Sequence, residues 1–248
     1  MLLDCYKPTF ARKFIAGSSQ YLEVSSAALN SYPLTMACWF NRTSNDILSA
    51  LMSIGTNGGS ERVVMFAGDS ANSNHVIAAT QISNVQTSTG YIANTWSHAA
   101  VTFSSSPTCA YLNGGGKGSG TLADSLAAAN STNIGCRWST TRGAFADASI
   151  AWPAIWNIAL GDADIARLAS GAHPLTVRKE AIVAFWDFDG REKEFGIKAA
   201  YPLTNSGSVP VNGPSFLRTR VTRPWMLGAG YVAATGNRRR RVICAGAY

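Results

Sequence analysis

The segment Leu34-Thr-Met-Ala-Cys-Trp-Phe40 decides the fold, because apolar side chains recur in it at every even-numbered position. This two-residue period is typical of a β-strand that presents one apolar side to a buried layer. Tyr21-Leu-Glu-Val24 alternates in the same way, with Leu22 and Val24 on one side. The two segments predict strands of a β-sandwich.

Further extended segments follow along the chain, separated by clusters of Gly, Asn or Ser that favour turns. Their spacing is typical of Greek-key antiparallel sheets. Residues 162–170 are predicted to form a short surface helix, because acids occupy the first turn and Gly171 follows the last. The Gly-rich residues 113–120 lack the spacing of a phosphate-binding loop and are predicted to form a mobile turn. The segments predicted to be extended are Val63 to Ala67, Val76 to Gln81, Trp96 to Phe103, Ala110 to Leu112, Thr132 to Gly135, Ala148 to Trp156 and Ala181 to Phe188.

The composition predicts one large domain whose surface relies on uncharged polar side chains. The chain has 248 residues, of which 46% are hydrophobic and only 14% charged. Its five cysteines are scattered and show no CxxC spacing, so neither a disulfide framework nor a zinc site is encoded. Asp4 and Lys7 interrupt the N-terminal stretch where a signal peptide needs apolar residues, and no window reaches transmembrane length. We therefore expect folding in a reducing cytoplasm, with no membrane segment and no cofactor.

The excess positive charge lies at the C-terminal end of the chain. The formal net charge is +7, and residues 218–248 hold seven Arg and no acid, so residues 1–217 are neutral overall. Apolar residues interrupt this basic segment, which predicts an arm that lies against an acidic partner. The expected parts are an N-terminal segment (1–13), a globular domain (14–217) and a basic arm (218–248). The residues expected to dock the partner are Arg218, Arg220, Arg223, Trp225, Arg238, Arg239, Arg240 and Arg241.

Five short segments of the chain are similar to sequence motifs of one protein family, and they occur in the same order as in that family. Leu34-Thr-Met-Ala-Cys-Trp-Phe40 is similar to a "TISAWV" strand, Thr95-Trp-Ser-His-Ala-Ala-Val101 to "WHHVA", and Ala110-Tyr-Leu-Asn-Gly114 to an "LYVNG" hairpin. Ile155-Trp-Asn-Ile-Ala-Leu160 is similar to "RIWNRAL", and Ala184-Phe-Trp-Asp-Phe-Asp-Gly190 to a closing "YWPFDG" strand. Together they resemble the laminin-G-like branch of the concanavalin A-like lectin/glucanase superfamily, over residues 14–217. The resemblance implies an all-β, antiparallel two-sheet jelly-roll sandwich with one short helix, followed by the extended C-terminal arm.

The sequence shows no arrangement typical of an active site. Glycosidases of this superfamily carry two carboxylates on one strand face, and residues 187–192 approach this pattern most nearly. Gly190 and Arg191 are predicted to end the strand between those acids. The three histidines are far apart in sequence, and the aspartates show no calcium-ligand spacing. The sequence therefore predicts neither catalytic residues nor a metal site.

Three tryptophans, Trp138, Trp152 and Trp225, lie off the strands that the resemblance identifies, so their rings are expected to be free for a partner. Residues 136–142 place Trp138 close to two arginines, an arrangement suited to an acidic glycan or a carboxylate-rich surface. An ordinary packed loop is the alternative for this segment. The candidate glycan-binding residues are Arg137, Trp138, Arg142 and Trp152.

The leading functional hypothesis is a non-catalytic structural protein of a virion. Modules of this kind resemble those carried by tailed bacteriophages, and a particle protein folds in the host cytoplasm without an export signal. We expect a capsid decoration or cement subunit that docks through its basic arm on other virion proteins, in an oligomer or on a particle. The alternative is a carbohydrate-binding or host-adhesion module that contacts a cell-surface glycan. Nucleic-acid binding through the Arg run is disfavoured, because residues 1–217 contribute no basic face.

Overall fold

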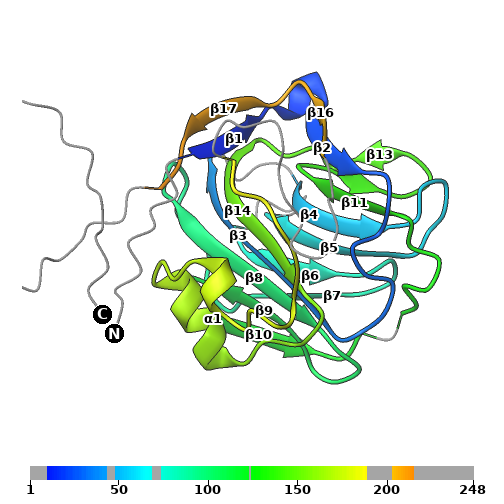
Figure 1. Ribbon diagram of the computed structural model, residues 1–248, viewed down its shortest axis with the longest axis vertical. Helices are drawn as coiled ribbons and strands as arrows, with labels where there is room; N and C mark the ends of the chain where they lie inside the picture. The colour runs from blue at the N-terminus through cyan, green and yellow to red at the C-terminus, as the bar shows by residue number, and fades with distance from the viewer. Residues whose placement is uncertain (1–9, 44–47, 69–73, 123, 189–202, 215–248) are drawn as a thin grey trace, which may run out of the picture. The chain divides into compact units, whose positions relative to one another are not determined.

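The computed structural model describes residues 10–43, 48–68, 74–122, 124–188 and 203–214. Over these residues the chain forms two antiparallel β-sheets that face each other (Figure 1), which confirms the predicted two-sheet sandwich. Sheet A has the order β10 (Gly115–Gly120), β9 (Thr108–Leu112), β8 (Ser97–Phe103), β3 (Leu34–Arg42), β14 (Ala148–Trp156), β1 (Phe10–Phe14) and β17 (Val209–Asn212), with β15 (Ile182–Phe185) paired to β14. Sheet B has the order β16 (Thr204–Ser206), β2 (Tyr21–Val24), β11 (Ser131–Ile134), β4 (Ser49–Gly55), β5 (Arg62–Ala67), β6 (Val76–Ala79) and β7 (Asn84–Gln86).

The main core lies between the two sheets and is filled from alternate positions of their strands. On β3, the side chains of Met36, Cys38 and Phe40 are buried in this core, as their two-residue period predicts. Sheet B contributes Met52 and Met65 from its central strands. Burying a large apolar side chain stabilises the fold by roughly 1.5–3 kcal/mol. The alternating strands therefore form the main stabilising layer.

Most of the predicted segments are confirmed, including the helix, which forms as α1 (Asp162–Ala169). Strand β4 is not recognisable from its sequence, because both of its sides are buried and a bulge between Ala50 and Met52 interrupts its alternation. The mobile turn predicted over residues 113–120 is wrong, since β10 pairs with β9. Glycines allow β10 to lie close to β7, where a Cβ atom on Gly118 would collide with the carbonyl oxygen of Gln86. The expected C-terminal arm lies outside the described residues.

Helix α1 and the chain that follows it cover the outer side of sheet A, over β8 and β9 (Figure 1). Ile165 and Leu168 of the helix join Trp156 and Tyr111 in a second, buried apolar cluster. The indole N–H of Trp156 donates a hydrogen bond of 2.9 Å to the carbonyl oxygen of Val177. Apolar packing therefore closes this side of the sandwich.

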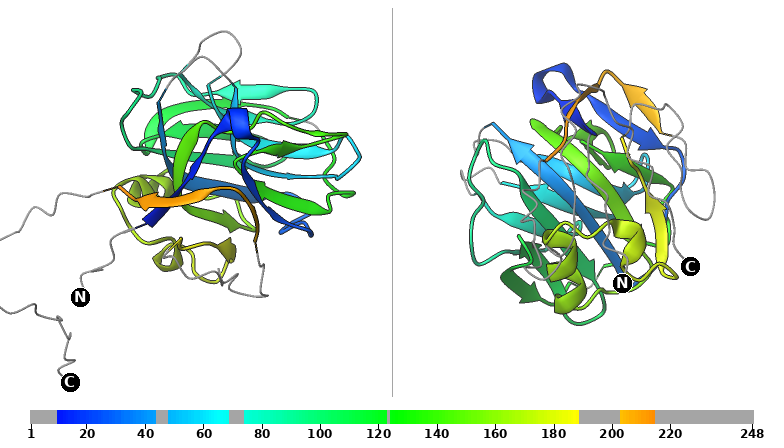
Figure 2. Two further views of the ribbon diagram at one scale, coloured as in Figure 1. Left: turned by 90° about the horizontal axis from the view of Figure 1, so that it is seen from above. Right: turned by 60° about the vertical axis from the view of Figure 1, so that its left-hand side comes forward.

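A short hairpin of β12 (Arg137–Trp138) and β13 (Arg142–Gly143) lies on the outer side of sheet B. Ser53 Oγ on β4 donates a hydrogen bond of 2.9 Å to the carbonyl oxygen of Cys136, just before the hairpin. The N–H of Gly58 donates one of 3.1 Å to the carbonyl oxygen of Ser139. Figure 2 shows the two sheets from two further directions, with the edge strand β17 beside β1. The hairpin is thus fixed to β4 and to the turn that follows it.

Candidate functional site

A row of polar residues crosses the outer side of sheet B. Asn133 on β11 pairs in register with Glu23 on β2 and with Ser53 on β4. Their sequence neighbours Leu22 and Ile134 lie in the core between the sheets. Because successive side chains of a strand point to opposite sides, the period that fills the core also places this polar row outside it.

A shallow hollow, which we call the polar groove, opens beside this row and has a volume of about 330 Å³. Its lining residues are Glu23, Ser25, Asn57, Asn130 and Ser131. A second hollow of about 450 Å³ adjoins it along residues 25–30 and shares Ser25 and Asn130 with it. The polar groove therefore offers one carboxylate, two amides and two hydroxyls, with no large apolar side chain.

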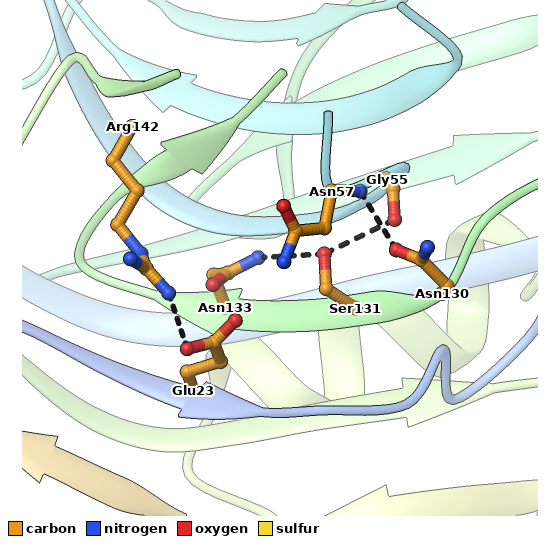
Figure 3. Close-up of polar contacts among 7 residues, drawn as sticks. All are labelled: Glu23, Gly55, Asn57, Asn130, Ser131, Asn133 and Arg142. Atoms are coloured by element: carbon orange, nitrogen blue, oxygen red, sulfur yellow. Dashed lines mark hydrogen bonds and ion pairs between the residues drawn. The ribbon is translucent and has the colours of Figure 1, made fainter. Parts of the chain in front are cut away.

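Hydrogen bonds within the chain fix the wall of the polar groove (Figure 3). Oδ1 of Asn130 accepts a hydrogen bond of 2.7 Å from the backbone N–H of Asn57. Ser131 Oγ donates one of 3.1 Å to the carbonyl oxygen of Gly55, and it accepts one of 3.4 Å from Asn133 Nδ2. Within the described part of the chain, the side-chain amide of Asn57 makes no hydrogen bond, so it is available to a ligand.

An ion pair with Arg142 holds the carboxylate of Glu23 (Figure 3). Both side chains are largely buried, with 12% of Glu23 and 25% of Arg142 exposed. The guanidinium of Arg142 also lies 4.3 Å from the ring centre of Tyr21 and 4.1 Å from that of Trp138, so cation–π attraction adds to the ion pair. Oε1 of Glu23 accepts no hydrogen bond from the described residues. This oxygen is therefore the one that a ligand could use.

Several buried polar atoms on this side of the sandwich have no hydrogen-bond partner among the described residues. They are Oδ1 of Asn133, Nε of Arg137, Nε1 of Trp138 and Nε of Arg142. Leaving a buried polar atom unpaired costs about 1–3 kcal/mol. Natural proteins accept such local costs mainly at functional sites. The unpaired atoms therefore mark the hairpin and the neighbouring part of sheet B as a candidate functional site.

A family model for the concanavalin A-like lectin/glucanases superfamily, of laminin G type, matches residues 16–166, which is more than half of the chain. The chain belongs to this superfamily. Its members share a fold with very different sites, so membership establishes the sandwich and leaves the ligand open. No curated protein matches the sequence at a significant level.

Two solved structures illustrate how the superfamily fold recurs. A proposed carbohydrate binding protein from Bacteroides ovatus ATCC 8483 is 16% identical, with a TM-score of 0.60 over 84% of this chain and 60% of its own. This chain thus spans about 60% of the length of that protein. The heptameric SAP-like pentraxin from Limulus polyphemus is 12% identical, with a TM-score of 0.55 over 83% of this chain and 96% of its own. At these identities the likeness shows the fold alone.

The structure buries Trp152 on the outer side of sheet A, so the expectation of an exposed ring at this position is wrong. Only 2% of Trp152 is exposed. It lies in a bulge of β14 between Ala151 and Ala154, where its φ of 51° falls in the left-handed region. Its ring packs edge-on against His173, with ring centres 4.8 Å apart. The bulge turns Trp152 into the apolar cluster outside sheet A.

The other three candidate glycan-binding residues lie together on the hairpin β12–β13. Arg137, Trp138 and Arg142 are each half-buried, and Trp138 lies against the Arg142 guanidinium. The segment is a packed hairpin, which is nearer to the packed loop considered as the alternative than to an open aromatic surface. The arginines and the tryptophan of the expected docking arm lie outside the described residues.

The residues that line the polar groove could not be recognised from the sequence of this protein. Its residues come from three separate places: β2 with the turn after it, the turn after β4, and the start of β11. The one local signal is the polar Glu23 between Leu22 and Val24, which marks an outward position. Only the pairing of β2, β11 and β4 brings these positions together.

Neither a metal site nor a membrane span emerges from the described part of the chain. No three His, Cys, Asp or Glu side chains gather there in a way that could hold a metal ion. No helix in these same residues is long and apolar enough to cross a bilayer.

Proposed function

We propose that this protein binds carbohydrate in the polar groove and does not cleave it. The observation that carries the proposal is the lining of the groove, where a carboxylate, two amides and two hydroxyls meet on one side of a lectin-type sandwich. A sugar presents many hydroxyls that both donate and accept hydrogen bonds, and these groups complement them. The similar fold of the proposed carbohydrate binding protein from Bacteroides ovatus supports this choice.

Binding without hydrolysis is proposed because the groove supplies a single carboxylate. Glycosidases use two carboxyl groups, at a separation of roughly 5–9.5 Å. Among the described lining residues only Glu23 carries one, and it is held in an ion pair with Arg142. Glu23 is therefore suited to accept hydrogen bonds from sugar hydroxyls.

The test is a glycan array probed with the purified full chain, followed by calorimetry with the sugars that bind. Asn57→Ala removes an unpaired amide from the groove and leaves the backbone bond to Asn130 in place. We expect it to weaken binding about tenfold, the value of one hydrogen bond to a ligand. Asn212→Ala, an exposed amide on β17, is the matched control and should bind like the wild type. Equal affinity in all three proteins would refute the groove as the binding site.

The docking role of residues 218–248 remains a separate proposal, supported by the seven arginines and the absence of acids in that segment. In it, the lectin-type domain is carried on a virion as a decoration or adhesion subunit, and the arm binds an acidic surface of the particle. Removing residues 218–248 should abolish attachment to the particle and leave sugar binding by the groove intact. Equal occupancy of particles with and without the arm would overturn the docking role.

A further inference from the structure

Two arginines beside the polar groove differ from Arg142 in having no acidic partner. Arg62 begins β5 and Arg137 begins β12. Arg142 is paired with Glu23, whereas neither Arg62 nor Arg137 forms an ion pair with any described residue. Among the described residues, no ion pair therefore balances the charge of these two arginines, which we call the arginine pair.

The fold brings the arginine pair to one place through Gly55 at the end of β4. A Cβ atom on Gly55 would lie 3.1 Å from Cβ of Arg62 and 3.2 Å from the carbonyl oxygen of Trp138. The stem of Arg62 and the hairpin β12–β13 therefore flank Gly55 from two sides. Gly143, which pairs with Arg137 across the hairpin, carries no side chain that could cover the guanidinium.

The surroundings leave donors of both guanidinium groups unused. Within the described residues, the guanidinium of Arg62 makes one hydrogen bond, from Nη1 to the carbonyl oxygen of Ser60, at 3.1 Å. Nε of Arg137 is buried and has no partner among the described residues. The pKa of Arg62 is lowered by burial and then by the charge of Arg137, and Asp124 offsets only part of this. Together with the approach of Arg62 and the hairpin at Gly55, this indicates that the two cations lie near each other.

Arg62 also adjoins the polar groove, because Arg62 and the groove residue Ser131 both pair in register with Gly55 across sheet B. The turn between β4 and β5 carries Asn57, which lines the groove, and ends beside Arg62. The same turn is bonded to Ser139, directly after β12, through the N–H of Gly58. A ligand chain that fills the groove and continues past Asn57 would therefore meet the arginine pair.

We propose that the arginine pair, Arg62 with Arg137, is a subsite for the carboxylate or sulfate group of an acidic sugar bound in the polar groove. This inference rests on the proposed function and names its ligand class. Guanidinium groups bind carboxylate and sulfate oxygens through two parallel hydrogen bonds. An anion between Arg62 and Arg137 would relieve their repulsion and accept hydrogen bonds from their terminal Nη groups. A sugar fits better than an acidic protein surface, because the adjoining groove is a shallow hollow lined by amides and hydroxyls.

The probe is a set of matched oligosaccharides: oligogalacturonate with its methyl ester, and sulfated and sialylated chains with their uncharged counterparts. Binding of each pair to the full chain is measured by calorimetry at two salt concentrations. We expect each acidic member that binds to do so at least about tenfold more tightly than its neutral counterpart. The preference should shrink at higher salt, because screening weakens exposed charge pairs.

The decisive variant is Arg62→Gln with Arg137→Gln, which should reduce the acidic preference to about onefold while the affinity for the neutral sugar is kept. Arg62→Lys with Arg137→Lys keeps the charge and should retain part of the preference, which separates charge from misfolding. Arg167→Gln, an exposed arginine on α1, removes one positive charge far from the site and should change nothing.

Three outcomes would overturn the inference. If neutral and acidic sugars bind with equal affinity, the arginine pair is not a subsite, but the polar groove can still be the sugar site. Binding of no sugar at all overturns both the groove and the arginine pair. Displacement of the acidic sugar by a poly-glutamate peptide at equal molar concentration would assign the arginine pair to an acidic protein partner instead.

Discussion

The outer sides of the two sheets differ in how well their buried polar groups are paired. On sheet A, the helix α1 and the chain after it cover an apolar cluster, and the indole N–H of the fully buried Trp156 is paired with a backbone carbonyl. On sheet B, the strands β5 and β6 also carry an apolar cluster, but the part formed by β2, β11 and the hairpin is polar, and atoms of Asn133, Arg137 and Trp138 stay unpaired among the described residues. The first arrangement contributes stability, whereas the second gives up stability and leaves hydrogen-bonding groups for a ligand.

Replacing a tryptophan on each side gives the largest expected difference. Trp156→Ala should lower the free energy of unfolding by about 3–5 kcal/mol, because it empties a fully buried site and removes a hydrogen bond. Trp138→Ala should cost less than about 2 kcal/mol, since this ring is half-buried and its N–H is unpaired. Urea unfolding followed by circular dichroism measures both. Equal losses would break the comparison.

His98 is an exception on sheet A, because its Nδ1 is buried without a partner in the described structure. Burial lowers the pKa of His98 to about 3, below its ordinary value of 6.5. The unfolded chain therefore takes up a proton that the folded chain excludes, and stability falls as the pH drops from 6.5 towards 3. Between pH 7.5 and pH 5 this should remove about 2 kcal/mol of stability. In a His98→Gln variant the loss over that interval should shrink, and an unchanged pH dependence would contradict the burial effect.

Neighbouring positions on β11 allow a comparison of the inner and outer sides of sheet B. Thr132 Oγ1 accepts a hydrogen bond of 2.8 Å from the N–H of Ala28 and donates one of 3.0 Å to the carbonyl oxygen of Ser26. Thr132→Val should therefore cost about 1–2 kcal/mol. Asn133→Val should change stability by less than about 0.5 kcal/mol, because it loses only a weak bond to Ser131. Chemical denaturation of the two variants measures the difference, and a large loss in Asn133→Val would show that the outer position is structural.

The smallest effect is expected where α1 is tied to sheet A. Asp162 accepts hydrogen bonds of 2.9 Å from Lys117 and 2.7 Å from Tyr111, and these bonds lower the pKa of its carboxyl group. Its stabilising effect is therefore present above the pKa of the unfolded chain and is lost as the pH falls below it. Because the side chain of Asp162 is 68% exposed, this effect should stay below about 1 kcal/mol. Thermal unfolding of wild type and Asp162→Asn should differ slightly at pH 6, and the difference should shrink as the pH falls below 3.8, the ordinary pKa of the carboxyl group. A difference that stays constant over that range would contradict this assignment.

The sequence predicts the sandwich well because the alternation of strands such as β2 and β3 is local. It does not predict the polar groove, because Glu23, Asn57 and Asn130 become neighbours only through the pairing of β2, β11 and β4. The prediction of an exposed ring at Trp152 is wrong for another reason. A bulge in β14 changes the direction of this side chain, and nothing in the local sequence pattern indicates the bulge. Arg137 and Arg142 are recognisable as candidates from their spacing around Trp138. Arg62 could not be recognised as a candidate, because its proximity to the hairpin depends on contacts across Gly55.

The contact between β10 and β7 at Gly118 also bears on self-association. β10 and β7 are edge strands of sheets A and B and lie next to each other. An exposed edge strand can pair with a strand from another copy of the chain. With no side chain at Gly118, the two borders shield each other. A bulkier residue there would push the two edge strands apart and leave their backbone groups open to pairing with another copy of the chain.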